Sequence, residues 1–502
     1  MKASAKDTYI LYNLFCTGGG IWGANQFTAM AFIEELFGVP ITSLFDVFSG
    51  ASIGGLGVSA ANIPDKNNPA KPGYSMAFAA RALYPAALAL LNSNDFIVLK
   101  QLLNRASKLL VRRNITPGHL NQLVLEIMLS RYFGDTTMSQ TVKPVFVHAH
   151  DMVTKEGKWF GRSDRILDTK KLGSKLNNGK TKLLSAAMAS SSMHSVLEMY
   201  HEIESDHHFT DMAPYLTPAS IHRAIKRMAQ SAQEDLRDGM GLAKYAPHWL
   251  QNLVSGLQNA KGKNLSMLFN DLAENLPHRR FEQAKNVTVR TIAFEAADDV
   301  EAREFDPLKH SSGDVFDFFT NFIANTRYGP YQASFHQVKQ MGMQDLSADF
   351  DDESIAITGK PACTYITANI VPLTPEEKRE FPSANYADAD PDNFLKVYQF
   401  AKNEYVLKNL GTILGIVEEI ADEKLRRGEM DRMEHARLVA IARNTTNEKA
   451  ATVLDTIIVT KDNAQEVLTE FGLIRRGRTI SLTEDLHAAV VRAADTPVLV
   501  AV

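Results

Sequence analysis

Cysteine is scarce in this chain, which has only Cys16 and Cys363 among its 502 residues. A disulfide framework needs several pairs of cysteines, so the sequence gives no sign of an oxidising compartment. The two cysteines also lie far apart, with no cluster of histidines and cysteines around them. A structural zinc site is therefore not expected.

Positive charge is not in excess either. The formal net charge is −4 at pH 7, whereas a domain that binds nucleic acid is clearly basic. We therefore expect no nucleic-acid partner.

Long apolar segments are missing as well. The best candidate for a membrane span, residues 76–91, is interrupted by Arg81 and Pro85 and is shorter than the ~20 residues that a span requires. Near the N-terminus, the apolar residues 9–16 form a short run that contains Asn13 and leads into glycines instead of a cleavage site. The sequence thus predicts neither a transmembrane segment nor a signal peptide, and we expect a cytoplasmic protein that can lie peripherally at a membrane.

The first 60 residues alternate between strand and helix patterns. Residues 8–16 are apolar and β-prone and lead into glycines, which indicates a buried strand that ends in a turn. Residues 24–37 have helical spacing, residues 38–40 form a turn, and residues 45–49 form a second short strand. This order predicts an α/β fold with a mainly parallel central sheet flanked by helices.

Later segments extend this pattern. Because 502 residues exceed what one hydrophobic core usually supports, we expect two domains or one enlarged domain. We expect further strands at 144–150, 287–294 and 362–371, a loop at 62–74, turns at 154–158 and 209–218, and helices within 76–129, at 183–194, at 221–231 and beyond 391.

The first motif with chemical meaning is Gly50-x-Ser52-x-Gly54, which stands between an apolar strand and a helical pattern. A serine on a sharp strand-to-helix turn has its hydroxyl lifted clear of the sheet, and the flanking glycines avoid a clash in the tight turn. The N-terminus of the following helix directs its positive dipole end at that oxygen. The motif alone is also compatible with a plain turn, but its setting favours a nucleophile.

The second motif is the hexapeptide GGGIWG at residues 18–23, directly after the first strand. It has the spacing of a dinucleotide fingerprint, which also needs an acidic residue about 20 positions further on, at the end of the second strand. Glu34 and Glu35 fall inside the helix, and Asp46 begins the next strand instead of ending it. The dinucleotide interpretation therefore lacks its acidic residue. Two other interpretations stay open, namely a glycine loop that holds an oxyanion through its N–H groups and a simple glycine turn.

Asp211 is a candidate functional residue because of its place in the order of the motifs. A glycine-triplet loop comes first, the serine motif follows about 30 residues later, and Asp211 lies far downstream, before Pro214. This order resembles the patatin-like phospholipases, which have a Gly-Gly-Gly-x-Arg/Lys-Gly loop, a Gly-x-Ser-x-Gly elbow and an Asp-Gly-Gly/Ala motif. The segments 44–50, 144–152, 185–192 and 365–373 are also similar to stretches of that family. The resemblance is good over residues 8–230, loose over 285–375, and absent after about 380.

The chain departs from the family pattern at two positions. Trp22 stands where the family has Arg or Lys, and Met212 stands at the first glycine of the Asp-Gly-Gly/Ala motif. The backbone donors of the loop, the serine and the aspartate are all retained.

The resemblance implies a lipid acyl hydrolase. Ser52 would be the nucleophile, Asp211 would take its proton directly as a dyad partner, and the N–H groups of Gly18, Gly19 and Gly20 would hold the oxyanion. No metal or organic cofactor is implied. The expected substrate is a phospholipid or another lipid ester, with phospholipase A or lysophospholipase activity preferred.

The implied organisation is a patatin-like acyl hydrolase domain over residues 1–380 and a helical C-terminal region over 381–502. The C-terminal region is a candidate site for a protein activator or for a homo-oligomer contact. Residues 76–91 and the basic residues of 105–113 are candidates for transient contact with a membrane surface. A helix that covers the core and a solvated helix face, respectively, are the favoured interpretations of these two segments.

Three alternatives remain. One is a catalytically silent lipid- or partner-binding protein on the same fold, which Trp22 and Met212 favour. Another is an α/β-hydrolase with a Ser-His-Asp triad, in which His222 or His278 would follow the acid in the chain. Other histidines available for such a triad are His148, His150, His194, His201, His207 and His208. A nucleotide-binding oxidoreductase is a distant third.

Overall fold

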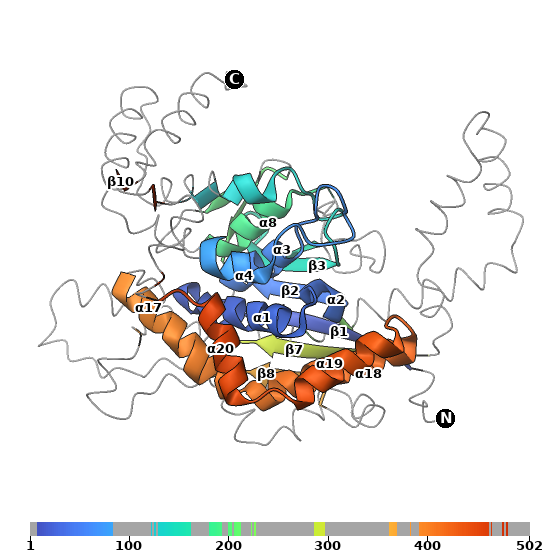
Figure 1. The fold of residues 1–502 in the computed structure, drawn as a ribbon. Helices are drawn as coiled ribbons and strands as arrows, with labels where there is room; N and C mark the ends of the chain where they lie inside the picture. Colours follow the sequence, from blue (N-terminus) through green and yellow to red (C-terminus); the bar gives the residue numbers. More distant parts are fainter. Residues whose placement is uncertain are drawn as a thin grey trace, which may run out of the picture.

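The computed structural model describes residues 8–83, 129–161, 180–192, 199–202, 205–211, 286–296, 361–368 and 391–460, together with residues 122, 125–126, 222, 225–226, 382, 463, 474–475 and 478–479. These residues build one eight-stranded sheet with helices packed against it (Figure 1). Two very short strands, β9 (Ile474–Arg475) and β10 (Arg478–Thr479), form a separate pair.

The central sheet has the strand order β5-β6-β3-β2-β1-β7-β8, and β4 pairs with β3 as well. The bounds are β1 (Thr8–Cys16), β2 (Val47–Ala51), β3 (Val145–Asp151), β4 (Glu156–Gly161), β5 (Tyr200–Glu202), β6 (His207–Thr210), β7 (Asn286–Phe294) and β8 (Cys363–Ile366). The strands β3, β2, β1, β7 and β8 are mutually parallel, whereas β4, β5 and β6 add antiparallel pairs at one end. The predicted mainly parallel sheet is confirmed.

β1 is the centre of this sheet because its sequence suits burial on both faces. Its nine residues are apolar or uncharged, and all but Ile10 are buried. It pairs with β2 on one side and, along its whole length, with β7 on the other. A continuous apolar run of this kind is what a parallel strand covered on both faces requires.

Helices cover one face of the sheet. The helix α1 (Gly23–Phe37) has only Glu35 exposed, because other helices surround it. Near it lie α2 (Ile41–Leu44), α3 (Ile53–Ala61), α4 (Met76–Phe78) and the π-helix η3 (Ala79–Leu83), and α8 (Leu183–Ser191) packs on α3. Figure 1 shows α1, α3 and α4 in front of the strands. A smaller apolar cluster, which includes Phe15, Val289 and Ile225, occupies the opposite face.

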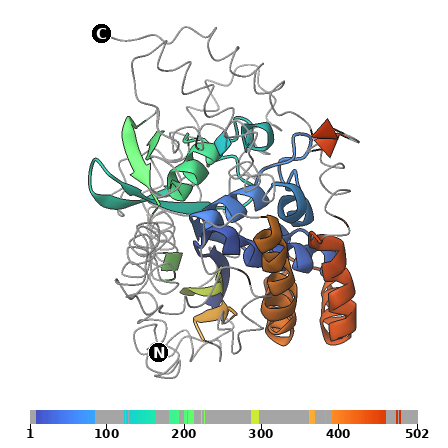
Figure 2. The ribbon, with the colours of Figure 1, turned by 90° about the vertical axis from the view of Figure 1, so that its left-hand side faces the viewer.

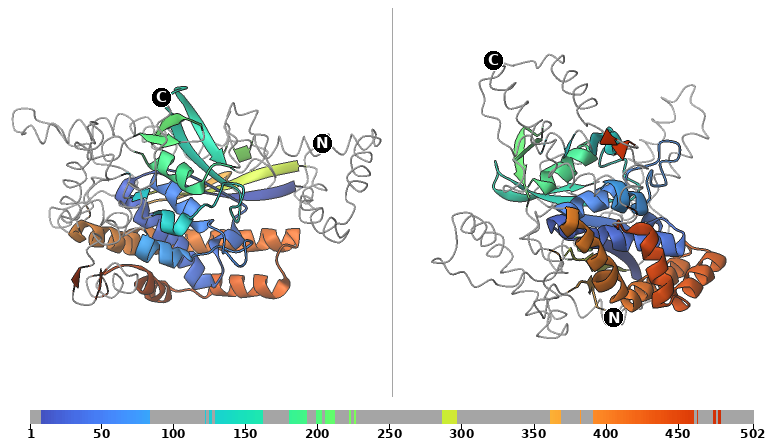
Figure 3. Two further views of the ribbon diagram at one scale, coloured as in Figure 1. Left: turned by 90° about the horizontal axis from the view of Figure 1, so that it is seen from above. Right: turned by 60° about the vertical axis from the view of Figure 1, so that its left-hand side comes forward.

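The chain is helical over most of residues 391–457, as predicted, whereas the short strands β9 and β10 depart from the helical prediction for 381–502. The elements are α17 (Pro391–Phe400), the π-helix η7 (Ala401–Leu407), α18 (Leu410–Arg427), α19 (Arg432–Arg443) and α20 (Asn447–Ile457). α17, α19, α20 and η7 contact α1, so these helices extend the core built by the N-terminal half (Figures 1 and 3). Tyr405 Oη donates to Ile366 O at 2.8 Å, and Asn409 Nδ2 donates to Thr367 O at 2.8 Å, which fixes the start of α18 beside the end of β8.

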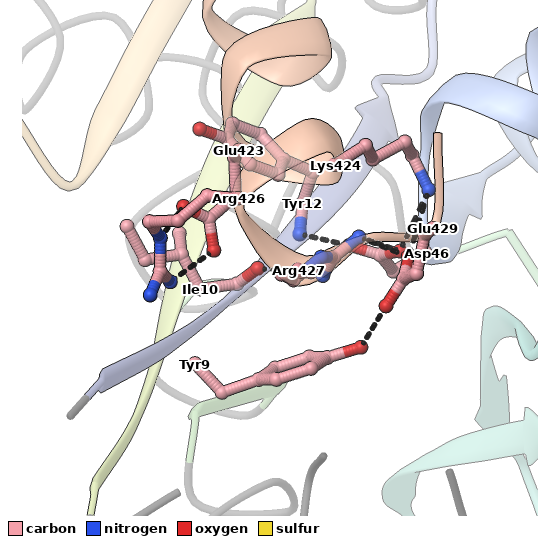
Figure 4. A network of polar contacts seen from close by, with 9 residues as sticks. All are labelled: Tyr9, Ile10, Tyr12, Asp46, Glu423, Lys424, Arg426, Arg427 and Glu429. Carbon is pink, nitrogen blue, oxygen red and sulfur yellow. Dashed lines mark hydrogen bonds and ion pairs between the residues drawn. The ribbon is translucent and has the colours of Figure 1, made fainter. Parts of the chain in front are cut away.

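A buried ion cluster joins the end of α18 to the first two strands (Figure 4). Asp46, directly before β2, accepts from Arg427 at 2.9 and 3.0 Å, lies 3.2 Å from Lys424 Nζ and accepts from Tyr12 N at 2.9 Å. Burial alone would raise the pKa of Asp46, but the two cations outweigh that effect and hold the pKa well below its ordinary value. Glu429 lies 2.7 Å from Arg427 and completes the balance of charge.

Several sequence expectations need correction. The second strand begins at Val47 and reaches Ala51, two residues later than the predicted 45–49. The predicted turn at 154–158 lies at 152–155, and Glu156 begins β4. The segment expected to start as a turn at Phe209 is instead the end of β6, and its part beyond Asp211 lies outside the described residues. In each case hydrogen bonding to β3 or β1, which local residue preferences do not reveal, sets the strand boundary.

The candidate membrane segment is described only up to Leu83. Met76, Ala79 and Ala80 in it are buried in the main core, which supports the interpretation as a helix that covers the core. The remainder of residues 76–91 and the basic residues of 105–113 lie outside the described residues. Among the described helices, none combines the length and apolar character needed to cross a bilayer.

Candidate active site

Ser52 occupies the turn between β2 and α3, as the motif predicts. Its backbone angles are φ 55° and ψ −132°, a region that residues other than glycine rarely adopt. β2 ends at Ala51 and α3 begins at Ile53, so the whole change of direction falls on this one residue. A sharp strand–serine–helix turn of this kind is the geometry of a nucleophile elbow.

The two glycines of the motif are required by close approaches of the backbone. A Cβ atom on Gly50 would lie 2.6 Å from Gly54 O, and one on Gly54 would lie 2.2 Å from Cys16 O and 2.4 Å from Thr17 O. Contacts this short are not compatible with a side chain. The contact at Gly54 also shows that the elbow lies directly against the end of β1, where the glycine loop begins.

The backbone of Ser52 is held by the C-terminal end of α8. Ser52 N donates to Ser190 Oγ at 2.8 Å, and Ser190 Oγ in turn donates to His148 O of β3 at 2.6 Å. Ser191 Oγ donates to Ser52 O at 3.2 Å. Two neighbouring serines therefore bond both polar groups of the Ser52 backbone.

Asp211 directly follows β6, and its backbone is held by Ser192 at the C-terminal end of α8. Asp211 N donates to Ser192 O at 3.0 Å, and Thr210 Oγ1 donates to the same oxygen at 2.9 Å. Asp211 is partly exposed, whereas Ser52 is 8% exposed. We call residues 190–192 the serine run; it contacts both Ser52 and Asp211 and so brings the elbow and the end of β6 to one place.

The side chains of Ser52 and Asp211 are not hydrogen-bonded to each other in the part of the chain that the structure describes. Catalytic hydrogen bonds often tighten only when substrate is bound, so this geometry is compatible with a dyad. Met212, the departure from the family motif, lies outside the described residues.

The glycine loop follows β1 and is anchored on the side away from the elbow. Thr17 N donates to Phe294 O at 3.1 Å, and Gln26 Nε2 donates to both Thr17 O and Phe294 O at 2.8 Å. Gly18, Gly19 and Gly20 are partly exposed, and no described residue accepts a hydrogen bond from their N–H groups. Partly exposed, unbonded N–H groups beside an elbow are what an oxyanion hole needs.

Trp22, which stands where the family has a cation, supplies no charge to this loop. It is 2% exposed and packs edge-on against Phe400 at the end of α17, with 5.2 Å between the ring centroids. The position that carries a charge in the family is thus an aromatic contact with the C-terminal helices here.

A Ser-His-Asp triad would need a histidine that is hydrogen-bonded to Ser52. His148 is buried in β3, stacks edge-on against Trp159, and has a pKa lowered to about 3 by burial. His222 Nδ1 lies 3.1 Å from Thr291 Oγ1 of β7, and His207 Nδ1 lies 2.6 Å from Asp151 Oδ2. No described histidine is hydrogen-bonded to Ser52, and His194 and His278 lie outside the described residues.

Nor do the described residues contain a cluster of three or more histidine, cysteine or carboxylate side chains suited to a metal ion. Both cysteines are buried and neither forms a disulfide, and burial raises the pKa of the Cys363 thiol to about 12. Both side chains lie inside the core.

Comparison with known families agrees with the α/β fold. Residues 14–212 match the family model described as patatin-like phospholipase. Over these residues the chain thus matches a patatin-like phospholipase domain, and that family is one of lipid acyl hydrolases. Among solved structures, the chain is similar to VipD from Legionella pneumophila, with 11% identity, a TM-score of 0.24, and coverage of 97% of this chain and 81% of that chain. No curated protein matches the chain.

The sequence could not reveal the serine run as part of the site. The three residues were visible only as part of a small-residue helix that resembles the family. Their contacts depend on β3 and β6 lying beside the elbow, which follows from sheet order and not from local sequence.

Proposed function

We propose that this protein hydrolyses carboxylic esters of lipids, with Ser52 as nucleophile and Asp211 as its general base. The observation that carries the proposal is the serine run, because its successive residues hold the Ser52 backbone and the Asp211 backbone at one helix end. The strained elbow and the unbonded glycine N–H groups support it.

In the first half of the reaction, Ser52 Oγ attacks the carbonyl carbon of the ester while its proton passes to Asp211. The carbonyl oxygen becomes an oxyanion held by N–H groups of Gly18, Gly19 and Gly20. The N–H of Ser52 itself already bonds Ser190 Oγ, so this donor is not available and the glycine loop has to supply the charge stabilisation. The ester C–O bond then breaks, the alcohol leaves with the proton from Asp211, and an acyl group stays on Ser52.

In the second half, Asp211 takes a proton from a water molecule that attacks the acyl carbon. The bond to Ser52 Oγ breaks, Oγ regains a proton, and a fatty acid leaves. Each step uses only groups of the chain, the lipid and water.

The preferred substrates are phospholipids and lysophospholipids, met at a membrane surface by a cytoplasmic protein. The C-terminal region is proposed to carry contacts with a protein activator or a second copy of the chain. The contact of Trp22 with Phe400 supports a link between that region and the glycine loop.

The test is fatty-acid release from vesicles of mixed phospholipids, and turnover of a soluble short-chain ester, by wild type, Ser52→Ala and Asp211→Asn. We expect both variants to lose at least ~10²–10⁴-fold in kcat. Ser59→Ala, which removes another buried hydroxyl of α3, and Asp206→Asn, in the turn before β6, are matched controls. An Asp211→Asn variant with near wild-type kcat would show that the base is a different residue.

The alternative is a binding protein without catalysis, which Trp22 and Met212 favour. Covalent labelling of Ser52 by a fluorophosphonate separates the two. Labelling of wild type but not of Ser52→Ala requires an activated serine, whereas a folded wild type that is never labelled supports the binding protein.

A further inference from the structure

Large apolar side chains are exposed at few places on the described surface. They are Met152, Val153, Met199 and Met433, with 38%, 57%, 38% and 84% of the residue exposed. Met433 lies on α19, in the C-terminal helices. The other three lie at one end of the sheet, around the turn between β3 and β4 and at the start of β5.

Strand pairing brings these three residues to the same part of the surface. Met152 N donates to His208 O at 2.8 Å, so Met152 continues the pairing of β3 with β6. β5 pairs with the other side of β6, with Tyr200 opposite Phe209. Met199, one residue before Tyr200, therefore lies level with Thr210 on the next strand.

The alternation of side chains places the two methionines on one face. Asp151, Phe209 and Tyr200 form a row across β3, β6 and β5, and all three are buried. Their neighbours along each strand point to the opposite face, because side chains alternate. Met152 and Met199 are such neighbours, so both lie on that opposite face, and Val153 follows at the tip of the turn.

This surface borders the site. Ala51, next to Ser52, lies opposite His148 of β3, and β3 continues three residues further to Asp151. The end of β3, after which the β3–β4 turn begins, therefore lies roughly 10 Å beyond the end of β2, at ~3.3 Å per residue. Thr210, level with Met199, is followed directly by Asp211. Figure 2 shows the β3–β4 hairpin and the strands β5 and β6 projecting from one end of the sheet.

We propose that Met152, Val153 and Met199, here called the methionine edge, contact the phospholipid surface and seat the site on it. The proposal rests on the proposed function, since it names how that site meets its substrate. Insertion of a few apolar side chains into the headgroup boundary gives a reversible contact. A stable protein interface buries about 800 Å² on each partner, which three side chains do not supply.

The charges around the methionine edge fit a contact that depends on apolar insertion. Glu156 pairs with Lys158 at 3.1 Å, and the exposed Asp206 and Lys155 carry opposite charges, so the charges of this region are largely balanced within it. We therefore expect binding to phosphatidylcholine vesicles, with little gain from anionic lipid and little loss at high salt.

The first experiment measures cosedimentation with phosphatidylcholine vesicles in a Ser52→Ala background, so that the lipid stays intact. The triple variant Met152→Gln, Val153→Thr, Met199→Gln is expected to bind about tenfold or more weakly, because three apolar groups no longer leave water. Met433→Gln, the matched control, is expected to bind as the parent does. Unchanged binding by the triple variant, or an equal loss with Met433→Gln, overturns the proposal.

The second experiment reports insertion directly. The chain's two cysteines are both buried, so Val153→Cys adds an exposed thiol that an environment-sensitive dye can label. Addition of vesicles should shift the emission of this dye to the blue, and the same dye on Met433→Cys should not respond. A label at 153 that stays in water in the presence of bound vesicles overturns the proposal.

Turnover of a soluble short-chain ester separates this proposal from the proposed function. The triple variant with Ser52 intact should turn over this ester at the wild-type rate and lose rate only on vesicles. A loss on both substrates contradicts a purely interfacial role. A wild type inactive on the soluble ester contradicts the proposed function instead, and the two binding experiments still decide the role of the methionine edge.

Discussion

Ser52 has a backbone conformation that costs a residue other than glycine about 1–3 kcal/mol. Such a conformation persists only where surrounding contacts over-determine it. Here Ser190 and Ser191 bond the N–H and the carbonyl of Ser52, respectively. Side chains at the end of α8, far along the chain, thus stabilise the strained elbow. We expect them to position the nucleophile.

Ser190→Ala tests this role at a single hydroxyl. The variant leaves Ser52 N and His148 O without their partner, so we expect a loss of about 1–3 kcal/mol in the free energy of unfolding. We also expect kcat to fall about tenfold or more with KM little changed, because the nucleophile is misplaced while substrate contacts remain.

The matched control is Ser192→Ala. Ser192 is as buried as Ser190, but its hydroxyl donates only to Met188 O of its own helix, and its carbonyl still accepts from Asp211 N. Steady-state kinetics and urea unfolding of both variants decide the matter. If kcat falls equally in both, the effect is one of general destabilisation and Ser190 has no special role.

Gly54→Ala tests the contact between the elbow and the end of β1. The added Cβ would lie 2.2 Å from Cys16 O, a backbone atom that cannot yield without moving β1, so we expect loss of the folded protein or of the site. Gly411→Ala in α18 is the control: no atom lies within 4 Å of its new Cβ. There we expect a gain of about 0.4–1 kcal/mol. Urea midpoints and near-ultraviolet circular dichroism measure both, and equal behaviour of the two would contradict the close approach.

At the scale of elements, one buried carboxylate connects three helices. Glu34 of α1 accepts from Ile41 N at the start of α2, at 2.8 Å, and from Met76 N at the start of α4, at 2.5 Å. Burial is the main influence and raises its pKa to about 7, despite these two hydrogen bonds.

This raised pKa predicts a pH dependence. The folded protein holds the proton more tightly than the unfolded chain, whose glutamate has a pKa near 4.5, so the stability from protonated Glu34 is complete below that value. It is lost progressively as the pH rises from about 4.5 to about 7. In Glu34→Gln this contribution is absent. The difference in unfolding free energy between wild type and variant should therefore fall over this range and be flat above it, and a difference that grows with pH would contradict the assignment.

Elements with a strong internal pattern were predictable from the sequence, and elements defined by their partners were not. β1, α1 and β7 were expected within a residue of their bounds, since each is a long apolar or periodic segment. β4 was missed because Glu156, Gly157 and Lys158 resemble a turn, and it becomes a strand only by pairing with β3. The elbow serine and the glycine loop were found for the same reason as β1, because a strand that leads into glycines is a local signal.

The position of Asp211 in the site could not be predicted from local sequence. It depends on β6 pairing antiparallel to β3 and on Ser192 accepting from its N–H. Both contacts join residues distant in the chain, and only the resemblance to a family pointed to this aspartate.

At the scale of the whole molecule, the C-terminal helices complete the core of the N-terminal half. Arg427 and Lys424 reach Asp46 across 381 and 378 positions of sequence. The hydroxyl of Tyr398, in α17, donates to Ala80 O across 318 positions of sequence. No sequence pattern marks such pairs, because the paired residues lie hundreds of positions apart in the chain.

Asp46→Asn tests the ion cluster. The variant leaves Lys424 and Arg427 with less opposing charge inside the protein, so we expect a loss of about 3–5 kcal/mol at pH 7. Because the folded-state pKa of Asp46 is depressed, its contribution is present above the ordinary carboxyl pKa and is lost as the pH falls below it. The variant should thus be less sensitive to acid than wild type between neutral pH and pH 3.

The control is Asp455→Asn, which removes the carboxylate of a pair whose aspartate side chain is 57% exposed. Exposed pairs contribute at most about 1 kcal/mol, so this variant should unfold close to wild type. Urea unfolding at several pH values measures both. Similar losses in the two variants would mean that the cluster around Asp46 has no more influence than a surface pair.

The pairing of β1 also sets an order of events during synthesis. The neighbour of β1 on one side lies 278 residues later, as in the contact of Asn13 with Thr291, and Arg426, which bonds Thr8 O, lies 418 residues later. At ~5–20 residues per second, the first strand leaves the ribosome tens of seconds before these partners exist. An apolar strand edge is exposed throughout that time, so the nascent chain depends on being kept from aggregation until α18 is made.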